Sequence, residues 1–349
     1  MTAPLDLRPL TDPIDPHAFK EFRVAKPHKI QRGRSVDVVS GVIAVGLFIT
    51  FFGAMVGGFI TALSRDESLG QHRGLITAGV LITLLALVWL IAASVARTAA
   101  ARHYRLYTFA QRNGLQYAAS SYGAHKQGLI FGIGRNHSVE GRIWSTNPDP
   151  NASPFPGLEA GTHTYVTGSG KNQQTHEWAY VSFPLPRRVP HILLDAKGNN
   201  SIFGSNLPVS FRRDQRLSLE GDFDKYFTLY CPKEYETDAL YIFTPDLMAS
   251  MIDYGKVYDI ELVDDRCFLY RNGKFKATDP AVWQHLHQLF QQIATRTQYR
   301  TARYADDRIQ DPSMNIVAPQ GQRLQQSFWP AVIIGGVMLL WFVISILLR

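Results

Sequence analysis

The chain has 349 residues, with 36 Lys and Arg against 29 Asp and Glu, and a net charge of +7. That length allows two domains, whereas two cysteines are too few for a disulfide framework and are typical of a reduced cytosolic protein. The charge is spread along the chain. We interpret the one basic stretch with aromatic residues, RTQYRTARY, as a solvated helix face and therefore expect no nucleic-acid partner.

Residues 1–35 form an N-terminal segment that is rich in proline and mixed charge and lacks apolar periodicity. This composition predicts a flexible basic tail with a short helix at PHAFKEFRVA, residues 16–25. Basic side chains beside a membrane attract anionic lipid head groups. We therefore expect lipid contact from the last four Lys and Arg residues before the first apolar run, Lys26, Lys29, Arg32 and Arg34.

Three long runs contain no Asp, Glu, Lys, Arg or His: residues 38–63, 74–96 and 328–348. Each has about 20 residues or more, enough at ~1.5 Å per residue to cross a hydrocarbon core about 30 Å thick. We predict a transmembrane hairpin over residues 36–97 and a third, C-terminal span. The 37 residues before the first run are too long for the leader of a cleaved signal peptide. Gly53 and Gly57 form a GxxxG pair, which packs helices within one chain or between two copies of a homo-oligomer.

Positive charge flanks the predicted hairpin on one side. The leader is basic, and Arg97, Arg102, Arg105 and Arg112 follow the second run, while the loop between the two runs balances two arginines with two acids. Basic segments are retained in the cytoplasm. We therefore expect the N-terminus and the main domain to be cytoplasmic and the C-terminus to lie outside.

Residues 98–310 carry the patterns of a mixed α/β domain. A helix continues the second span, with an apolar stripe on one face and Gly114 as its end. A strand pattern follows at 115–120. Two more, at 162–167 and 176–183, flank the polar loop GSGKNQQ and predict a hairpin.

The second half of this domain alternates helices and strands. Helical patterns cover residues 232–242, 244–255 and 279–299. YDIELV, RCFLYR and KFKA predict a meander with turns at Asp264-Asp265 and Asn272-Gly273. Residues 311–327 are expected to form a polar linker. The predicted fold class is α+β, with three transmembrane helices and a cytoplasmic mixed α/β domain of largely antiparallel strands.

Three stretches between residues 217 and 275 are LEGDFDKYFTLYCP, DALYIFTPDLMASMID and YDIELVDDRCFLY. They resemble a family of bacterial integral-membrane proteins of unknown function, in which a membrane helical hairpin precedes an α+β domain with GDFDKYF-type and TPDLM-type motifs. The resemblance implies a bacterial inner-membrane protein, and it supplies no activity. We expect the motif residues to be structural: Gly221, Asp222, Phe223, Asp224, Tyr226, Phe227, Thr244, Pro245 and Met248.

The most enzyme-like residues are Asp222 and Asp224, which on a strand would share a face and could bind a metal. Gly221-Asp222 has instead the pattern of a turn, with Lys225 as a nearby partner. The GSGKN segment lacks the first glycine of a phosphate-binding loop, because Tyr165 occupies that position. The eleven histidines form no set at ligand spacing. We therefore expect no catalytic, cofactor-binding or metal-ligating residues.

These patterns favour a non-catalytic, membrane-anchored cytoplasmic binding or scaffold module, whose partner is a membrane or cytoplasmic protein or a lipid head group. The alternative is a membrane-bound hydrolase or metal-dependent enzyme whose site assembles in the fold, for example from Asp222, Asp224, His137 and Glu140. A third hypothesis is a subunit of a larger membrane complex, which an exposed apolar face would favour.

Overall fold

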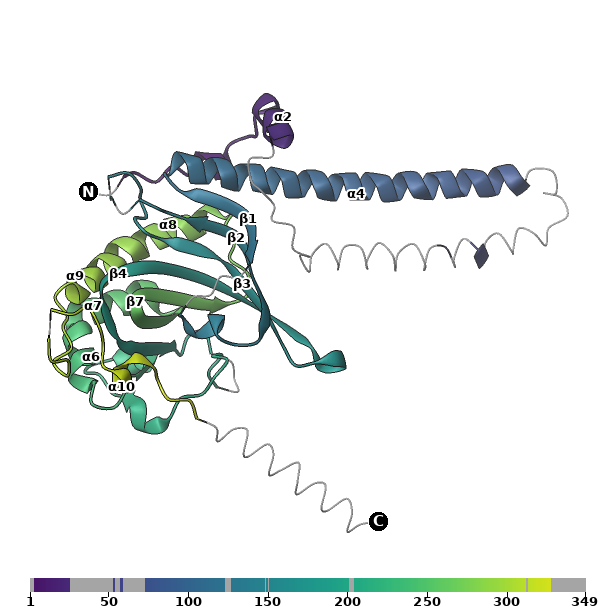
Figure 1. Cartoon of the computed structure of the whole chain (residues 1–349). Coiled ribbons are helices and arrows are strands. Elements are labelled where there is room, and N and C mark those ends of the chain that lie inside the picture. Colours follow the sequence, from purple (N-terminus) through teal and green to yellow (C-terminus); the bar gives the residue numbers. More distant parts are fainter. Residues whose placement is uncertain are drawn as a thin grey trace, which may run out of the picture. The chain divides into compact units, whose positions relative to one another are not determined.

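The computed structural model describes the following parts of the chain: residues 3–25, 53, 57–58, 73–122, 127–147, 149, 151–200, 204–311 and 313–327. They belong to two compact units, Pro13–Leu106 and the combination of Met1–Asp12 with Tyr107–Arg349. The second unit is an α+β domain built on one sheet (Figure 1).

Helix α4 (Arg73–Arg112) contains the second predicted span. Within the described residues it is the one helix long and apolar enough to cross a membrane, over Ile82–Arg112, and its most apolar window has no buried residue. The other two predicted spans lie outside the described residues, apart from three glycines of the first. The structure therefore shows one candidate span where the sequence predicts three.

Helix α2 (Pro16–Ala25) forms where PHAFKEFRVA predicted it. Phe22 is buried, and the rings of Phe19 and Phe22 meet the ring of Tyr104 edge-on, at centroid distances of 5.5 and 5.3 Å. Such edge-to-face pairs are a favoured aromatic geometry. Part of the segment expected to be a flexible tail is thus a helix packed against α4.

A seven-stranded antiparallel sheet forms the domain and confirms the α+β prediction. Its strands are β1 (Gln116–Tyr122), β2 (Arg135–Trp144), β3 (Glu159–Thr167), β4 (Gln174–Ala196), β5 (Arg216–Leu217), β6 (Phe227–Tyr230) and β7 (Asp259–Asn272). They lie in the order β1-β2-β3-β4-β6-β5, and β7 pairs with β4.

Strand β4 is the centre of the sheet because, over its 23 residues, it pairs with β3, β7 and β6 in turn. The predicted hairpin is formed by β3 and β4, which are joined through η3 (Gly170–Asn172). Tyr165 lies opposite His176, and His163 lies opposite Trp178, so the two histidines are not cross-strand partners.

The predicted meander is wrong at its first turn. YDIELV and RCFLYR form the single strand β7, which bulges at Asp264 instead of turning there. Asp264 has φ 53° and lies opposite Val189, where the register with β4 breaks after Pro184. Proline cannot donate to a ladder, so the irregular part of β4 faces the irregular part of β7. KFKA forms no strand either, because β7 ends at Asn272.

The helices of the domain are α5 (Phe223–Tyr226), α6 (Glu236–Ile242), α7 (Pro245–Ser250), the π-helical turn η5 (Met251–Gly255), α8 (Pro280–Leu289), the π-helical turn η6 (Phe290–Ala294), α9 (Thr295–Thr301) and α10 (Pro319–Gln322). Figure 1 shows α8 and α9 along one face of the sheet. They continue one another through η6, as the amphipathic pattern from Asp279 predicted, and the Asp279 carboxylate caps α8 by accepting from the N–H of Ala281. Trp283 is buried, with its ring 4.6 Å from that of Phe109 at the end of α4.

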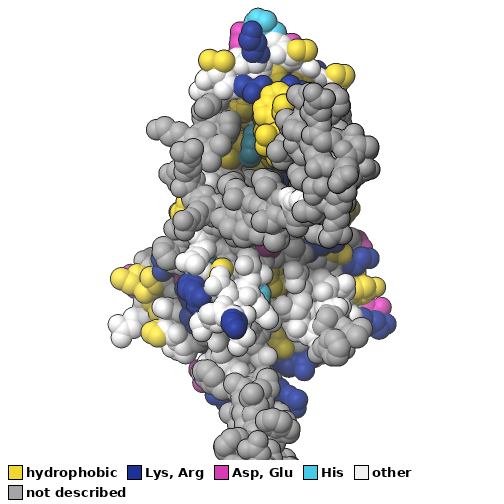
Figure 2. All heavy atoms as spheres, turned by 90° about the vertical axis from the view of Figure 1, so that its right-hand side faces the viewer, with side chains coloured by type: hydrophobic (Ala, Val, Ile, Leu, Met, Phe, Trp, Pro, Cys, Tyr) yellow, Lys and Arg dark blue, Asp and Glu magenta, His cyan; other side chains and the backbone are white. Residues whose placement is uncertain are grey.

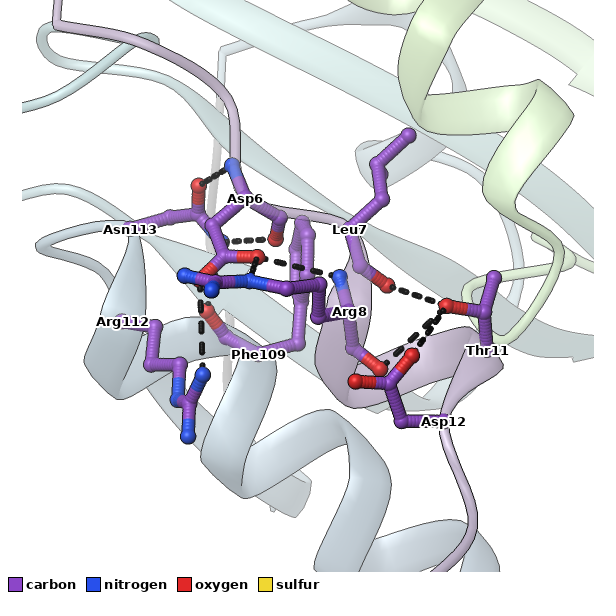
Figure 3. A network of polar contacts seen from close by, with 8 residues as sticks. All are labelled: Asp6, Leu7, Arg8, Thr11, Asp12, Phe109, Arg112 and Asn113. Carbon is purple, nitrogen blue, oxygen red and sulfur yellow. Dashed lines mark hydrogen bonds and ion pairs between the residues drawn. The ribbon is translucent and has the colours of Figure 1, made fainter.

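The N-terminal segment is tied to the end of α4 (Figure 3). Asn113 Oδ1 accepts from the N–H of Asp6 at 2.8 Å, and Asn113 Nδ2 donates to the carbonyl of Asp6 at 2.9 Å. The Asp6 carboxylate lies 2.7 Å from Arg8 and 3.5 Å from Arg112. The helix ends at the predicted place, since Gly114 adopts a φ of 65°. Residues 3–12 thus belong to the domain.

Residues 313–327, expected to form a linker, also pack on the domain. Val317 and Leu324 are buried, and Gln326 bridges to Phe211. Gly321 lies so close to Tyr235 that a Cβ at this position would approach the Tyr235 ring to 2.3 Å. Glycine is therefore required here by close packing, and the domain extends well beyond residue 310.

Candidate functional site

The two carboxylates of the acidic pair singled out by the sequence each contact neighbouring residues. Asp222 lies 2.6 Å from the ammonium of Lys225, at the surface. The Asp224 carboxylate accepts from the Ser218 hydroxyl and from the N–H of Leu219 at 3.2 Å. Both carboxylates therefore have local partners, as turn residues do.

The other motif residues lie in the framework of the domain. Phe223 and Phe227 are buried and stack at 5.0 Å, while Thr244 and Pro245 begin α7 with Met248 on its second turn. Tyr226 ends α5, and Gly221 adopts a φ of 72° just before that helix. Lys26, Lys29, Arg32 and Arg34 lie outside the described residues.

Two histidines meet on neighbouring strands. His137 Nδ1 of β2 lies 3.3 Å from His163 Nε2 of β3, and Tyr165 stacks on His176 at 4.9 Å. Within the described residues, no group of three or more His, Cys, Asp or Glu is placed to hold a metal ion. None of His137, Glu140, Asp222 and Asp224 lines the pocket between α6 (Glu236–Ile242) and the turn that follows α9.

A pocket of about 640 Å³ lies between α6 and the turn that follows α9. Its lining residues are Thr237, Asp238, Tyr241, Arg303, Tyr304, Ala305, Asp307 and Arg308. Three of them come from the DALY stretch and its flank, and the others come from the ARYADDR stretch. Nothing in the sequence patterns predicted that these two stretches lie side by side.

The inner wall of the pocket is fixed by hydrogen bonds. The Tyr304 hydroxyl donates to Asp238 Oδ1 at 2.8 Å, and the Arg308 guanidinium lies 3.1 Å from Asp238 Oδ2. Burial, followed by the neighbouring Asp238 carboxylate, raises the pKa of Tyr304. The hydroxyl therefore stays protonated at neutral pH and acts as a fixed donor.

Behind this wall, Asp306 ties three segments together. Its carboxylate accepts from the Tyr235 hydroxyl at 2.7 Å, from the N–H of Ala318 at 2.9 Å and from Arg308 at 3.1 Å. Burial acts to raise the pKa of Asp306, yet these hydrogen bonds lower it overall. The Arg308 guanidinium also lies 3.9 Å above the Tyr235 ring, so this arginine is held on several sides.

Exposed aromatic side chains lie at the pocket and beside it. Tyr241 is 42% exposed, and Leu240 beside it is 51% exposed. Tyr299 is 59% exposed and lies under the guanidinium of Arg303, at 5.2 Å. Arg303 and Asp307 make no ion pair with any other described residue, so a positive and a negative group remain available to a ligand.

The domain also contains a fully buried polar network. Glu261 Oε1 lies 2.7 Å from His191 Nε2, while Oε2 accepts from the Tyr270 hydroxyl at 2.6 Å and from the N–H of Leu129 at 2.8 Å. The N–H of Leu324 donates to His191 Nδ1 at 3.0 Å, so the ring proton is on Nε2 and faces Glu261. The network joins four segments of the chain, and its Glu261 and His191 residues are buried, with exposed fractions of 0% and 5%.

Cys231 and Cys267 are free and buried. Burial raises the pKa of the Cys231 thiol to about 12 and also raises that of Cys267. Neither thiol is therefore a thiolate nucleophile at neutral pH. On the face seen in Figure 2, the Lys and Arg side chains drawn in colour are scattered and do not merge into one band.

No family model matches this chain, and no curated protein matches it. One solved structure that resembles it is the crystal structure of the mycobacterial trehalose monomycolate transport factor A, TtfA. The likeness covers 56% of this chain and 90% of that chain, at 9% sequence identity and a TM-score of 0.34. A likeness at that level supports no inference about function, and the resemblance to a family of unknown function stays a prediction.

Proposed function

We propose that this protein is a membrane-anchored binding module whose pocket between α6 and the turn after α9 receives a protein partner. Helix α4 supplies a candidate anchor. The two further apolar runs and the basic residues after residue 96 support a multi-pass protein of the bacterial inner membrane, with the domain in the cytoplasm. Membrane lipids are then a second contact, through the basic segment that precedes residue 38.

The composition of the pocket rim carries the proposal of a protein partner. Tyr and Arg are the residue types enriched among the residues that dominate protein–protein binding. Tyr241 and Arg303 line this pocket and are exposed, and the exposed Tyr299 lies beside Arg303. The fixed inner wall of Tyr304, Asp238 and Arg308 lowers the entropy cost of binding. A partner side chain with a carboxylate would pair with Arg303.

The lining residues favour binding over a reaction. They include no His, Cys, Lys or Ser, the side chains most used as nucleophiles and general bases. Asp238 already accepts from Tyr304 and pairs with Arg308, which leaves it poorly placed to take a proton from a substrate. The hydrolase alternative would have to use other residues.

Native mass spectrometry of the full-length protein, extracted gently from its own membrane, tests this proposal. We expect a stoichiometric protein adduct on the wild type, and its loss in Tyr241→Ala and Arg303→Glu. Tyr122→Ala is the matched control, because Tyr122 on β1 is 44% exposed, close to the 42% of Tyr241.

The outcomes separate the hypotheses. An adduct that survives both pocket substitutions, or a wild type that carries no protein, overturns the assignment of the pocket to a protein partner. A lipid adduct lost in Arg303→Glu would assign the pocket to a head group. A tightly held small ligand would favour the enzyme alternative, and substitutions would then begin at the residues that hold it.

A further inference from the structure

A second group of polar side chains lies where β4 ends and β7 begins. Asp195 is the second-last residue of β4 and is 5% exposed, and Asp259 is the first residue of β7 and is 0% exposed. The N–H of Ala196 donates to Asp259 Oδ1 at 2.9 Å. The two carboxylates are close enough for the charge of Asp195 to act on Asp259.

The loop that follows β4 adds oxygen-bearing side chains to this place. The carboxamides of Asn199 and Asn206 lie against Asp259, while Asn200 and Ser205 lie against Asp195. Asn200 Oδ1 accepts from the N–H of Asn206 at 3.0 Å, which holds the two ends of the loop together. Two carboxylates, three carboxamide groups and one hydroxyl group therefore converge.

These groups are close together and yet poorly satisfied. Asp259 Oδ2, Asp195 Oδ1 and the side-chain oxygens and nitrogens of Asn199 and Asn206 are buried and complete no hydrogen bond of good geometry. Neither carboxylate has an ion-pair partner among the described residues, and Lys197 and Arg216 act on Asp195 only from a distance. A buried carboxylate without a partner is costly, so this arrangement lacks a positive group.

We propose that Asp195, Asp259 and the carboxamide oxygens of Asn199 and Asn206 bind a calcium ion. Calcium takes six to eight oxygen ligands from carboxylates, carboxamides and carbonyls, and two carboxylates neutralise its charge. Magnesium keeps most of its water and fits a buried carboxamide set less well. Zinc and copper prefer imidazole nitrogen and thiolate sulfur ligands, and none of these four side chains is a histidine or a cysteine. The ion would fix the loop after β4 onto β7.

Thermal unfolding of the full-length protein in detergent, at pH 8, tests the proposal. The wild type is compared in a chelator, in calcium and in magnesium. We expect calcium at 100-fold above its dissociation constant to raise the melting temperature by about 5 °C or more, and magnesium to raise it far less. Titration calorimetry of the same sample should give one calcium per chain.

Asp259→Asn distinguishes a calcium ligand from an acid that is only unpaired, because only the loss of a ligand should abolish the effect of calcium on the melting temperature. We expect this variant to melt above the wild type in chelator, since it removes a buried charge, and to lose the response to calcium. Asp195→Asn should lose that response as well and serves if the first variant does not fold. Asp222→Asn, whose carboxylate is exposed and paired with Lys225, should keep the full response.

The proposal is overturned if calcium leaves the wild-type melting temperature unchanged. It is also overturned if Asp259→Asn and Asp195→Asn respond to calcium as strongly as the Asp222→Asn control, since calcium would then act on the detergent, on lipid or on another site. Because the pocket between α6 and α9 plays no part in these measurements, their outcome is independent of the protein-partner proposal.

Discussion

Glu261 and Asp259 are two residues apart on β7, and both carboxylates are fully buried, yet their surroundings differ completely. Glu261 Oε2 accepts from the Tyr270 hydroxyl and from the N–H of Leu129, and its Oε1 lies 2.7 Å from His191 Nε2 in an ion-pair contact. Asp259 has one backbone donor on Oδ1, while its Oδ2 completes no hydrogen bond of good geometry. A buried carboxylate with hydrogen-bond donors holds segments together, whereas a buried carboxylate oxygen without a donor lacks a binding partner.

The sharpest test of this contrast is Glu261→Ala. The substitution leaves the Tyr270 hydroxyl, the N–H of Leu129 and the His191 ring without their carboxylate partner, so we expect the free energy of unfolding to fall by about 3–5 kcal/mol. Urea unfolding of the detergent-solubilised protein, followed by tryptophan fluorescence, measures it. Glu177→Ala is the control, because Glu177 on β4 is partly exposed and pairs with Lys274 at 3.3 Å. A loss below about 1 kcal/mol would contradict the structural role of Glu261.

Asp259 should respond to pH in the opposite sense to a satisfied carboxylate. Burial, and then the charge of Asp195, raise its pKa from 3.8 to about 7. Between pH 4 and pH 7 the folded protein therefore keeps a proton that the unfolded chain has lost, so stability falls as the pH rises through this window.

The measurement compares unfolding in a chelator for the wild type and Asp259→Asn. Relative to the variant, we expect the wild type to lose roughly 2–3 kcal/mol between pH 5 and pH 7. Asp195, whose pKa burial also raises, contributes a slope of the same sign to both proteins. Parallel pH profiles for the two proteins would show that Asp259 is satisfied after all.

Tyr270→Phe removes one of the two hydrogen bonds to Glu261 Oε2 and leaves the ring in place. We expect a loss of about 1–1.5 kcal/mol, because His191 and Leu129 still satisfy the carboxylate. Tyr122→Phe, at an exposed position, should be neutral under the same urea unfolding. If Tyr270→Phe costs as much as Glu261→Ala, the network depends on this hydroxyl alone.

The smallest effect on stability is expected for Asn206→Ala. In a chelator the substitution should change the free energy of unfolding by less than about 0.5 kcal/mol, since the carboxamide completes no hydrogen bond of good geometry. In calcium it should weaken binding by roughly tenfold, because one oxygen ligand is lost. Calorimetric titration of wild type and variant gives the ratio. Equal affinities would remove Asn206 from the calcium site.

Local patterns were enough to predict parts of the fold. The helix from Asp279, the end of α4 at Gly114 and the hairpin of β3 and β4 each follow from residues within one turn or loop. The continuous β7 could not be predicted in this way. Whether a chain turns or bulges at Asp264 depends on the proline-containing part of β4 opposite it, about 75 residues earlier in the sequence.

The pocket was missed for the same reason, since α6 and the turn at 303–308 come together only in the fold. The buried acids did leave a signal. Asp195 interrupts the apolar run HILLDA, and Asp259 and Glu261 interrupt YDIELV. An acid inside a strand that is otherwise apolar must find a donor or a cation, and this rule would have marked all three positions.

The hydrogen bonds between Asp6 and Asn113 bear on how the domain is arranged along the chain. Because residues 3–12 and 107 onward form one unit, everything from residue 13 to residue 106 is an insertion in a folded domain rather than a leader before it. The domain is interrupted in sequence but continuous in space. A water-soluble version should therefore be obtained by excising the insertion, rejoining the two ends with a short linker and ending the chain before the apolar run at 328–348. Cutting the chain after the last basic residue of α4 should not give a folded domain, because residues 3–12 would be lost.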